Sequence, residues 1–255
     1  MFEKVISFFD YCGDKLQELG NQISLKSHEL ADKFSQNFIE QDRWKYLADG
    51  LLITLRITFF AVIIGIVIGF VVAIIRSTHD KTGKLKFPNA IAKIYLTIIR
   101  GTPVMVQLLI AYYVIFTSPN ASKVIVATLA FGINSGAYVA EIVRSGIMSI
   151  DRGQFEAGRS LGLTYFQTMR SIIIPQAFKN VLPALSNEFI VLLKETSICG
   201  YIGLADLTRG GDIIRSQTWE AFMPLIAVAL VYLIVVMILT ALVSKLERRL
   251  RNSDH

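Results

Sequence analysis

The segment Leu51–Ile75 contains a single charged side chain, Arg56. An α-helix rises about 1.5 Å per residue, so a helix over this segment is long enough to cross the roughly 30 Å hydrocarbon core of a bilayer. The segment starts too deep in the chain, and its apolar run is too long, for a cleavable secretory signal. The sequence therefore predicts a membrane-spanning helix, and nothing at Met1 resembles a targeting sequence.

The composition is that of a membrane protein, with 53% hydrophobic and 18% charged residues and a mean hydropathy of +0.51. A net charge of +6 would also suit a nucleic-acid-binding protein. The basic residues, however, lie beside the apolar segments: residues 1–49 carry a net charge of −3, from nine acidic and six basic side chains, and the remainder carries +9. The positive charge therefore indicates membrane orientation, and no nucleic-acid partner is expected.

Five segments are predicted to span the membrane, which indicates an all-α membrane protein. They are Gly50–Arg76, Phe87–Phe116, Lys123–Ile150, Gln176–Ile198 and Ala221–Val243. The loop after the first span and the tail after the last are basic, and the positive-inside rule places both in the cytoplasm and the amino terminus outside. The basic residues are Arg76, Lys81, Lys84 and Lys86 in the loop and Lys245, Arg248, Arg249 and Arg251 in the tail. The external loop Gly200–Glu220 has room for a short helix.

We divide the chain into an amino-terminal extension (residues 1–49), a transmembrane domain (50–249) and a cytoplasmic tail (250–255). The extension has apolar residues at helical spacing with charged residues between them, so it should form amphipathic helices. These apolar residues are Phe2, Val5, Ile6, Phe9, Leu16, Leu19 and Ile23. We expect the extension to be extracytoplasmic, or to lie on the surface of the membrane or on a neighbouring subunit; a regulatory or partner-docking role is the alternative. Trp44 and Tyr46 lie where an interfacial aromatic belt would precede the first span.

The second span is interrupted by the sequence Arg100-Gly101-Thr102-Pro103. Proline removes a backbone hydrogen bond and glycine adds freedom, so the helix should kink or unwind at this point. Backbone groups freed at membrane depth are tolerated only against protein or a water-filled cavity. The break is therefore either part of a translocation path or a plain packing kink.

The third span has a small-residue face, which permits close contact with another helix. This face consists of Gly132, Ser135, Gly136 and Ala137. Near the inner end of the span, Glu141 and Arg144 are three residues apart and can pair with each other. Packing and local ion pairing are therefore expected to explain these residues.

The fourth span contains charged residues, and ionisable groups at membrane depth usually mark a substrate or ion path. Glu188 and Glu195 are seven residues apart, so they share one helix face about 10 Å apart, with Leu192 between them. A carboxylate left unpaired in a dry site is costly, so each needs an internal partner or a cationic ligand. The cationic head of a basic amino acid suits this arrangement, and structural ion pairing is the alternative.

The ligand's own carboxylate would need N–H donors from irregular backbone, for which Gly101–Thr102 and Ser135–Gly136 are the candidates. The predicted substrate-binding residues are therefore Glu188, Glu195, Asn187, Leu192, Gly101, Thr102, Ser135 and Gly136.

Between the third and fourth spans lies Gln154–Pro175, a helix-forming segment that is too polar to cross a bilayer. It contains Glu156-Ala157-Gly158, then Gly162, and then Ile172, Ile174 and Pro175. This pattern resembles the EAA loop of ATP-binding cassette (ABC) importer permeases. Over Gly50–Arg249 the chain is similar to permease subunits of the polar amino acid branch, whose other motifs match Arg100–Pro103, Ala137–Ile142 and Leu182–Glu188.

The resemblance implies the type I importer permease fold, with a cytoplasmic coupling helix in the loop 152–175. It also implies a bacterial cytoplasmic (inner) membrane location, a second permease subunit, identical or paralogous, two cytoplasmic ATPase subunits and an extracytoplasmic substrate-binding protein. The implied coupling residues are Phe155, Glu156, Ala157, Gly158, Leu161, Gly162 and Pro175. The family usually has a second alanine where Gly158 stands, so this glycine is expected to loosen the short helix. A glutamate at position 188 resembles that of basic amino acid members, though it is not confined to them.

Several classes of site are not expected. No G-x-x-x-x-G-K-[ST] motif occurs, so ATP and Mg are expected only on partner ATPases. His28, His79 and His255 are scattered and predict no metal site, and Cys12 and Cys199 are expected to be unpaired. No Ser-His-Asp set is plausible across these segments, so no catalytic triad is expected. The sequence thus predicts an importer permease for basic amino acids; the rivals are the same machine for glutamine or another neutral polar amino acid, and a membrane scaffold or receptor without transport.

Overall fold

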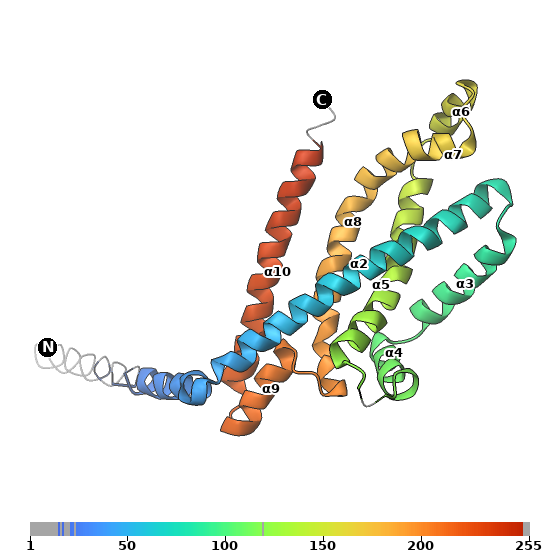
Figure 1. The fold of residues 1–255 in the computed structure, drawn as a ribbon. Coiled ribbons are helices and arrows are strands. Elements are labelled where there is room, and N and C mark those ends of the chain that lie inside the picture. The colour runs from blue at the N-terminus through green and yellow to red at the C-terminus, as the bar shows by residue number, and fades with distance from the viewer. Residues whose placement is uncertain (1–14, 16, 18–20, 23, 119, 252–255) are drawn as a thin grey trace, which may run out of the picture.

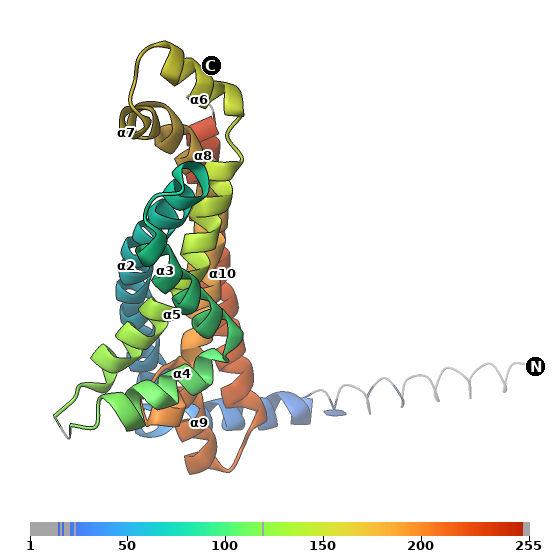
Figure 2. The same cartoon turned by 90° about the vertical axis from the view of Figure 1, so that its right-hand side faces the viewer.

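The computed structural model describes residues 15, 17, 21–22, 24–118 and 120–251, and these form helices joined by short connections (Figure 1). No strand occurs in this part of the chain, which confirms the all-α prediction. Helices α5, α8 and α10 run along one another, and α2 crosses them obliquely (Figure 1). Short helices lie at the two ends of this bundle, α6 and α7 at one and α4 and α9 at the other (Figure 2).

Helix α2 covers Trp44–Thr82 and is longer at both ends than the predicted first span. Its last turn closes where Gly83 adopts a left-handed backbone, with φ of 67°, and donates its N–H to the carbonyl of His79. Glycine adopts this conformation without the steric penalty of a Cβ atom. Trp44 and Tyr46 are exposed at the start of the helix, as an interfacial belt requires.

Two helices, α3 (Lys86–Gly101) and α4 (Val104–Ile110), occupy the predicted second span. A π-helical turn, Ala111–Ile115, continues α4. Helix α3 and this continued α4 meet at an angle of 107°. The predicted break is confirmed, and of its two expected forms the helix takes the unwound one, because Thr102 and Pro103 both adopt extended backbone. As a result α4 lies across the end of the bundle (Figure 2).

The remaining long helices are α5 (Lys123–Met148), α8 (Ile174–Glu195) and α10 (Phe222–Arg251). A 3-10 turn, Thr196–Ile202, follows α8, and α9 (Leu207–Thr218) fills the predicted external loop. In the described residues α2, α5 and α10 are long and apolar enough to cross a membrane, and a fourth span is present if α3 and α4 are counted as one broken span. Helix α8 is not among them. It carries Lys179, Glu188, Lys194 and Glu195.

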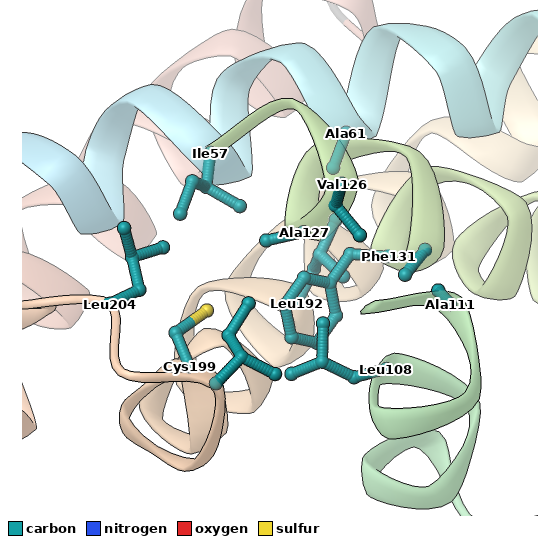
Figure 3. Close-up of a cluster of buried hydrophobic side chains, with 12 residues drawn as sticks. Ile57, Ala61, Leu108, Ala111, Val126, Ala127, Phe131, Leu192, Cys199 and Leu204 are labelled. Atoms are coloured by element: carbon teal, nitrogen blue, oxygen red, sulfur yellow. The ribbon is translucent and has the colours of Figure 1, made fainter. Parts of the chain in front are cut away.

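The main core lies at the α4 end of the bundle, where α2, α4, α5, α8 and the turn after α8 meet (Figure 3). Phe131 of α5 is fully buried there with Leu108 of α4 and Leu192 of α8. Cys199 is buried in the same core, whereas Cys12 lies outside the described residues. Dense van der Waals contact of this kind holds α4 against the bundle.

Helices α2 and α5 approach each other closely because glycines of each face the other. The four glycines are Gly65 and Gly69 on α2 and Gly132 and Gly136 on α5. A Cβ atom at Gly69 would lie 2.4 Å from Cγ1 of Val139, and one at Gly132 would lie 2.7 Å from Cγ2 of Ile64. The two glycines of each helix are four residues apart, the spacing that lets helix backbones approach closely in membranes. The small-residue face predicted on the third span therefore packs against α2.

Helices α6 (Arg152–Ser160) and α7 (Tyr165–Thr168) form a compact hairpin at the opposite end of the bundle (Figure 2). The Asp151 side chain caps α6 by accepting the Gly153 N–H, and Thr164 and Gln167 form a capping box on α7. Gly162 lies between them with φ of 77°. A π-helical turn, Met169–Ile173, then leads into α8, whose first turn contains Pro175.

Gly158 lies where α6 packs on Thr168 at the end of α7. A Cβ atom at this glycine would be 2.6 Å from Cγ2 of Thr168 and 2.7 Å from its Oγ1. The structure gives Gly158 a packing role in addition to its expected effect on the helix: its missing side chain allows the hairpin to close.

The end of the amino-terminal extension is anchored on the connection between α9 and α10. Asn37 is fully buried, donates to Glu220 Oε2 at 3.3 Å and accepts from Thr218 Oγ1 at 2.8 Å. Arg43 is 7% exposed and donates to Gln217 Oε1. The preceding Leu25 and Leu30 are exposed. All seven apolar residues of the pattern predicted from Phe2 to Ile23 lie outside the described residues.

We expect Gly69→Ala to lower the thermal unfolding midpoint of the purified protein. The added methyl group would overlap Val139 and come within 2.9 Å of the Ala140 nitrogen. Overpacking costs about 1–3 kcal/mol, which exceeds the roughly 0.5–1 kcal/mol that Ala gains over Gly in a helix. Val67→Leu adds a carbon to a side chain of the same helix that is 60% exposed and should leave the midpoint unchanged. Equal midpoints for the two variants would contradict the close packing of α2 on α5.

The contact between Gly158 and Thr168 allows a compensation test. Gly158→Ala alone should speed amide hydrogen exchange in residues 152–168 by about tenfold, because overpacking at this contact weakens the hairpin. Adding Thr168→Ala should restore slow exchange, since it removes the clashing methyl group and a hydroxyl that is buried without a hydrogen-bond partner. Thr168→Ala by itself is the matched control and should exchange like the parent. Fast exchange that persists in the double variant would refute this account.

Candidate functional site

Glu188 of α8 faces Ser135 of α5 across the helix contact. Ser135 is buried, and its Oγ donates a hydrogen bond to Glu188 Oε1 at 3.1 Å. In the described residues no Lys or Arg forms an ion pair with Glu188 or Glu195, although both carboxylates are half-buried. Each of them is therefore left with acceptor capacity that a ligand can use.

The other predicted ligand contacts have different environments. Leu192 is fully buried in the main core, so it presents no surface to a ligand, whereas Asn187 is exposed (Figure 3). Ser135 and Gly136 lie inside the continuous helix α5, where backbone N–H groups are already bonded within the helix. The structure therefore corrects the expectation of irregular backbone at Ser135–Gly136. Ser135 is brought to the site by its side chain.

The break between α3 and α4 is stabilised by two amide side chains that the sequence reading missed. Gln107 Nε2 donates to the carbonyls of Ile99 at 2.7 Å and Thr102 at 3.1 Å, and to Thr102 Oγ1 at 2.8 Å. Asn134 of α5 donates in turn to Gln107 Oε1 at 3.0 Å. The carbonyls of Ile99 and Thr102 beside the break thus have hydrogen-bond partners. The sequence did contain a signal for these two residues, because Gln107 and Asn134 are each an isolated amide side chain within an apolar run.

Gly101, by contrast, faces open space: no heavy atom lies within 4 Å of the position that its Cβ would occupy. Thr102 is also exposed. Of the predicted backbone donors, Gly101–Thr102 are therefore the ones placed beside accessible space.

Glu141 of α5 is the centre of a charge cluster. Its predicted pairing with Arg144 is confirmed by a contact of 3.0 Å between Arg144 and Glu141 Oε2. The structure adds Arg100 of α3 at 3.5 Å and Arg76 of α2 at 3.7 Å, both on Glu141 Oε1. Asp80 lies 4.0 Å from Arg144 on the far side of the cluster. The contacts of Glu141 with α2 and α3 could not be predicted from residue spacing within α5 alone.

The α6–α7 hairpin exposes several of the predicted coupling residues. Glu156, Ala157 and Leu161 are exposed, Leu161 by 76%, and the neighbouring Phe166 is exposed by 71%. Phe155 instead turns inward, where the Lys81 ammonium lies 3.7 Å from the centre of its ring. The hairpin therefore offers an apolar surface to a partner on one side and is joined to α2 on the other.

Helix α9 carries a charged group at the opposite end of the bundle. Asp212 accepts hydrogen bonds from both Arg209 and Arg215. These guanidinium groups, Arg215 foremost, hold the pKa of Asp212 below its usual range. Arg209 and Asp212 also line an open pocket of about 380 Å³ with Tyr201 and Thr208.

Comparisons with known proteins give a consistent result. Residues 65–252 match the family model described as binding-protein-dependent transport system inner membrane component. An arginine transport system permease protein of Bacillus subtilis is 37% identical over 211 residues, covering 82% of this chain and 94% of the relative. A glutamine transport system permease protein of Escherichia coli is 36% identical over 208 residues, covering 80% and 93%.

Among solved structures, the crystal structure of an amino acid ABC transporter with histidines contains a chain that is 44% identical, with a TM-score of 0.74. The match covers 83% of this chain and 98% of that one. The bent α3–α4 unit, the exposed helical hairpin and the matched sequence together carry the assignment. The chain belongs to the binding-protein-dependent transport system inner membrane component family, the permease subunits of ABC importers.

Proposed function

We propose that the chain is the permease of an ATP-driven amino acid importer whose substrates are basic amino acids. The observation that carries this proposal is the Glu188 carboxylate, which lies half-buried between α8 and α5 and receives one hydrogen bond, from the uncharged Ser135 hydroxyl. A buried carboxylate without a cationic partner favours a positively charged ligand. Glu195 lies about two turns further along the same face of α8 and likewise has no cationic partner among the described residues.

A basic amino acid meets this need with its side chain. A guanidinium or ammonium group donates charge-assisted hydrogen bonds to a carboxylate, and these are roughly twice as strong as neutral ones. The similarity to an arginine transport permease and to an amino acid transporter with histidines supports the same substrate class.

Glutamine is the second candidate, because a permease of similar identity carries that name. In this case the Ser135 hydroxyl holds Glu188 as a structural acceptor, and binding of the uncharged substrate amide does not depend on the charge of Glu188. Removing the negative charge of Glu188 would then matter little, which separates the two candidates.

Transport would proceed by alternating access coupled to two ATPase subunits, with a second permease subunit completing the path. The exposed side of the α6–α7 hairpin would dock on an ATPase. Its inner side packs on the ends of α2, α5 and α8 through a cluster that includes Val143, Met169 and Ile173. Movement of the docked hairpin would therefore be passed to the bundle as a rigid body. An extracytoplasmic binding protein would meet the end that carries α9.

We expect Glu188→Gln and Glu195→Gln to weaken binding of arginine and lysine to the permease–ATPase complex by about 10- to 100-fold each, because each removes a charge-assisted hydrogen bond. Binding is measured by calorimetry, with glutamine run in parallel. Glu247→Gln removes a carboxylate near the end of α10 and is the matched control. Unchanged affinity for basic ligands in both variants, or tighter binding of glutamine than of arginine to the parent, would reject the basic substrate class.

A second test addresses coupling. Leu161→Ala and Phe166→Ala remove side chains that are 76% and 71% exposed, so the permease should fold normally. If they anchor the hairpin in a groove of the ATPase, each should reduce transport-coupled ATP hydrolysis in proteoliposomes by about tenfold or more. Phe222→Ala removes a side chain that is 67% exposed at the start of α10 and should have no effect. Parent-like hydrolysis and uptake in both hairpin variants would place the coupling surface elsewhere.

A further inference from the structure

A cavity of about 340 Å³ lies between α2, α3 and α5, beside the charge cluster. Its lining residues are Arg76, Lys93, Leu96, Thr97, Arg100 and Glu141. Three of these side chains are cationic and one is anionic. The cavity is separate from the contact between Ser135 and Glu188, which involves α5 and α8.

The single carboxylate does not satisfy the cations that surround it. Glu141 is hydrogen-bonded to Arg144, and its distances of 3.5 Å to Arg100 and 3.7 Å to Arg76 are too long for good hydrogen bonds. Arg76 Nε is buried and has no hydrogen-bond partner in the described chain. Arg76, Lys93, Arg100 and Arg144 against Glu141 and Asp80 leave two positive charges in excess. Arg76 is the most enclosed of these cations, whereas Lys93 and Arg100 are exposed toward the open cavity. An excess of positive charge around an open cavity favours an anionic ligand.

The position of these residues on α3 points away from lipid. Lys93, Thr97 and Arg100 are spaced four and three residues apart, so they form one polar stripe along the helix. The exposed isoleucines Ile91, Ile94 and Ile98 lie roughly 130° around the helix from this stripe, at about 100° per residue. The isoleucines suit lipid and the polar stripe suits an aqueous path, which favours a soluble anion over a lipid headgroup.

We infer that this cavity is a subsite for the α-carboxylate of the transported amino acid. A carboxylate accepts paired N–H donors from guanidinium groups, and Lys93 supplies a further ammonium. The inference rests on the proposed amino acid substrate, but not on its side chain, because every α-amino acid carries this carboxylate. Arg100 directly precedes the break at Gly101-Thr102-Pro103. A change in the angle between α3 and α4 would therefore move one of the carboxylate's ligands.

The test compares each amino acid with its decarboxylated analogue. Arginine and agmatine, and glutamine and 4-aminobutanamide, are titrated into the permease–ATPase complex in nanodiscs of zwitterionic lipid. The parent should bind each amino acid at least tenfold more tightly than its analogue. Lys93→Gln and Arg100→Gln should each reduce this preference by about tenfold, since each removes a charged donor. Lys86→Gln, which removes a cation from the start of the same helix outside the cavity, is the matched control and should keep the parent's preference.

The ratio separates a binding role from a structural one, because a damaged fold weakens amino acid and analogue alike. A parental preference that persists in both cavity variants overturns the subsite while leaving the proposed function intact. Failure of the parent to bind any amino acid would instead count against the proposed function. A repeat in nanodiscs containing anionic lipid distinguishes the source of the anion: if the preference disappears there, a lipid phosphate occupies the cavity and the inference is overturned.

Discussion

The close contact between α2 and α5 is the interaction on which the other arrangements depend. Gly65 and Gly69 of α2 lie against Ser135 and Val139 of α5. Gly132 and Gly136 of α5 lie against Ile64 and Ile68 of α2, so the two helices approach at a distance that a side chain at these glycines would prevent. In a bilayer this contact is favourable mainly through packing, because lipid tails are as apolar as the helices themselves. The approach also brings Arg76 of α2 to Glu141 of α5. A wider gap would separate this ion pair, so the charge cluster depends on glycines that carry no chemistry of their own.

The sequence predicted the features that reside within one segment. It placed the long helices, the break at Arg100-Gly101-Thr102-Pro103, the short helix between the fourth and fifth predicted spans and the pairing of Glu141 with Arg144, each of which follows from local composition or helical spacing. It did not predict that Gln107 donates hydrogen bonds to carbonyls at the break, or that Asn134 donates to Gln107. Nor did it predict that Arg76 and Arg100 contact Glu141, or that Leu192 lies in the core. These facts depend on which helix faces which, and no pattern within a single segment contains that information. Ser135 is an example. From the sequence we expected its backbone N–H to be a donor, whereas in the structure its side-chain hydroxyl donates to Glu188 on the neighbouring helix.

The hairpin and the bundle are joined by contacts that leave little room for independent movement. Phe155 holds α6 to Lys81 at the end of α2, and Gly158 lets α6 lie directly on Thr168. From Thr168 the chain passes through Met169 and Ile173, which are buried against α5, into α8. Packed interiors transmit displacement rather than absorb it. A force applied to the exposed side of the hairpin therefore reaches α8, the helix that carries Glu188, through a short series of buried contacts.

Helix α5 carries both of the unusual charge environments, and they have opposite signs. At Ser135 it faces the Glu188 carboxylate, and six residues further toward the hairpin, about 9 Å along the axis, Glu141 is surrounded by arginines. An isolated charge of either sign is costly at this depth. In the proposed function, the two opposite charges of an amino acid substrate would offset these two environments. The same helix packs against α2 and faces α3 and α8, so a change in its contacts alters both environments together. The arrangement of charges thus follows from the helix packing, and the proposed binding of a zwitterionic substrate rests on that arrangement.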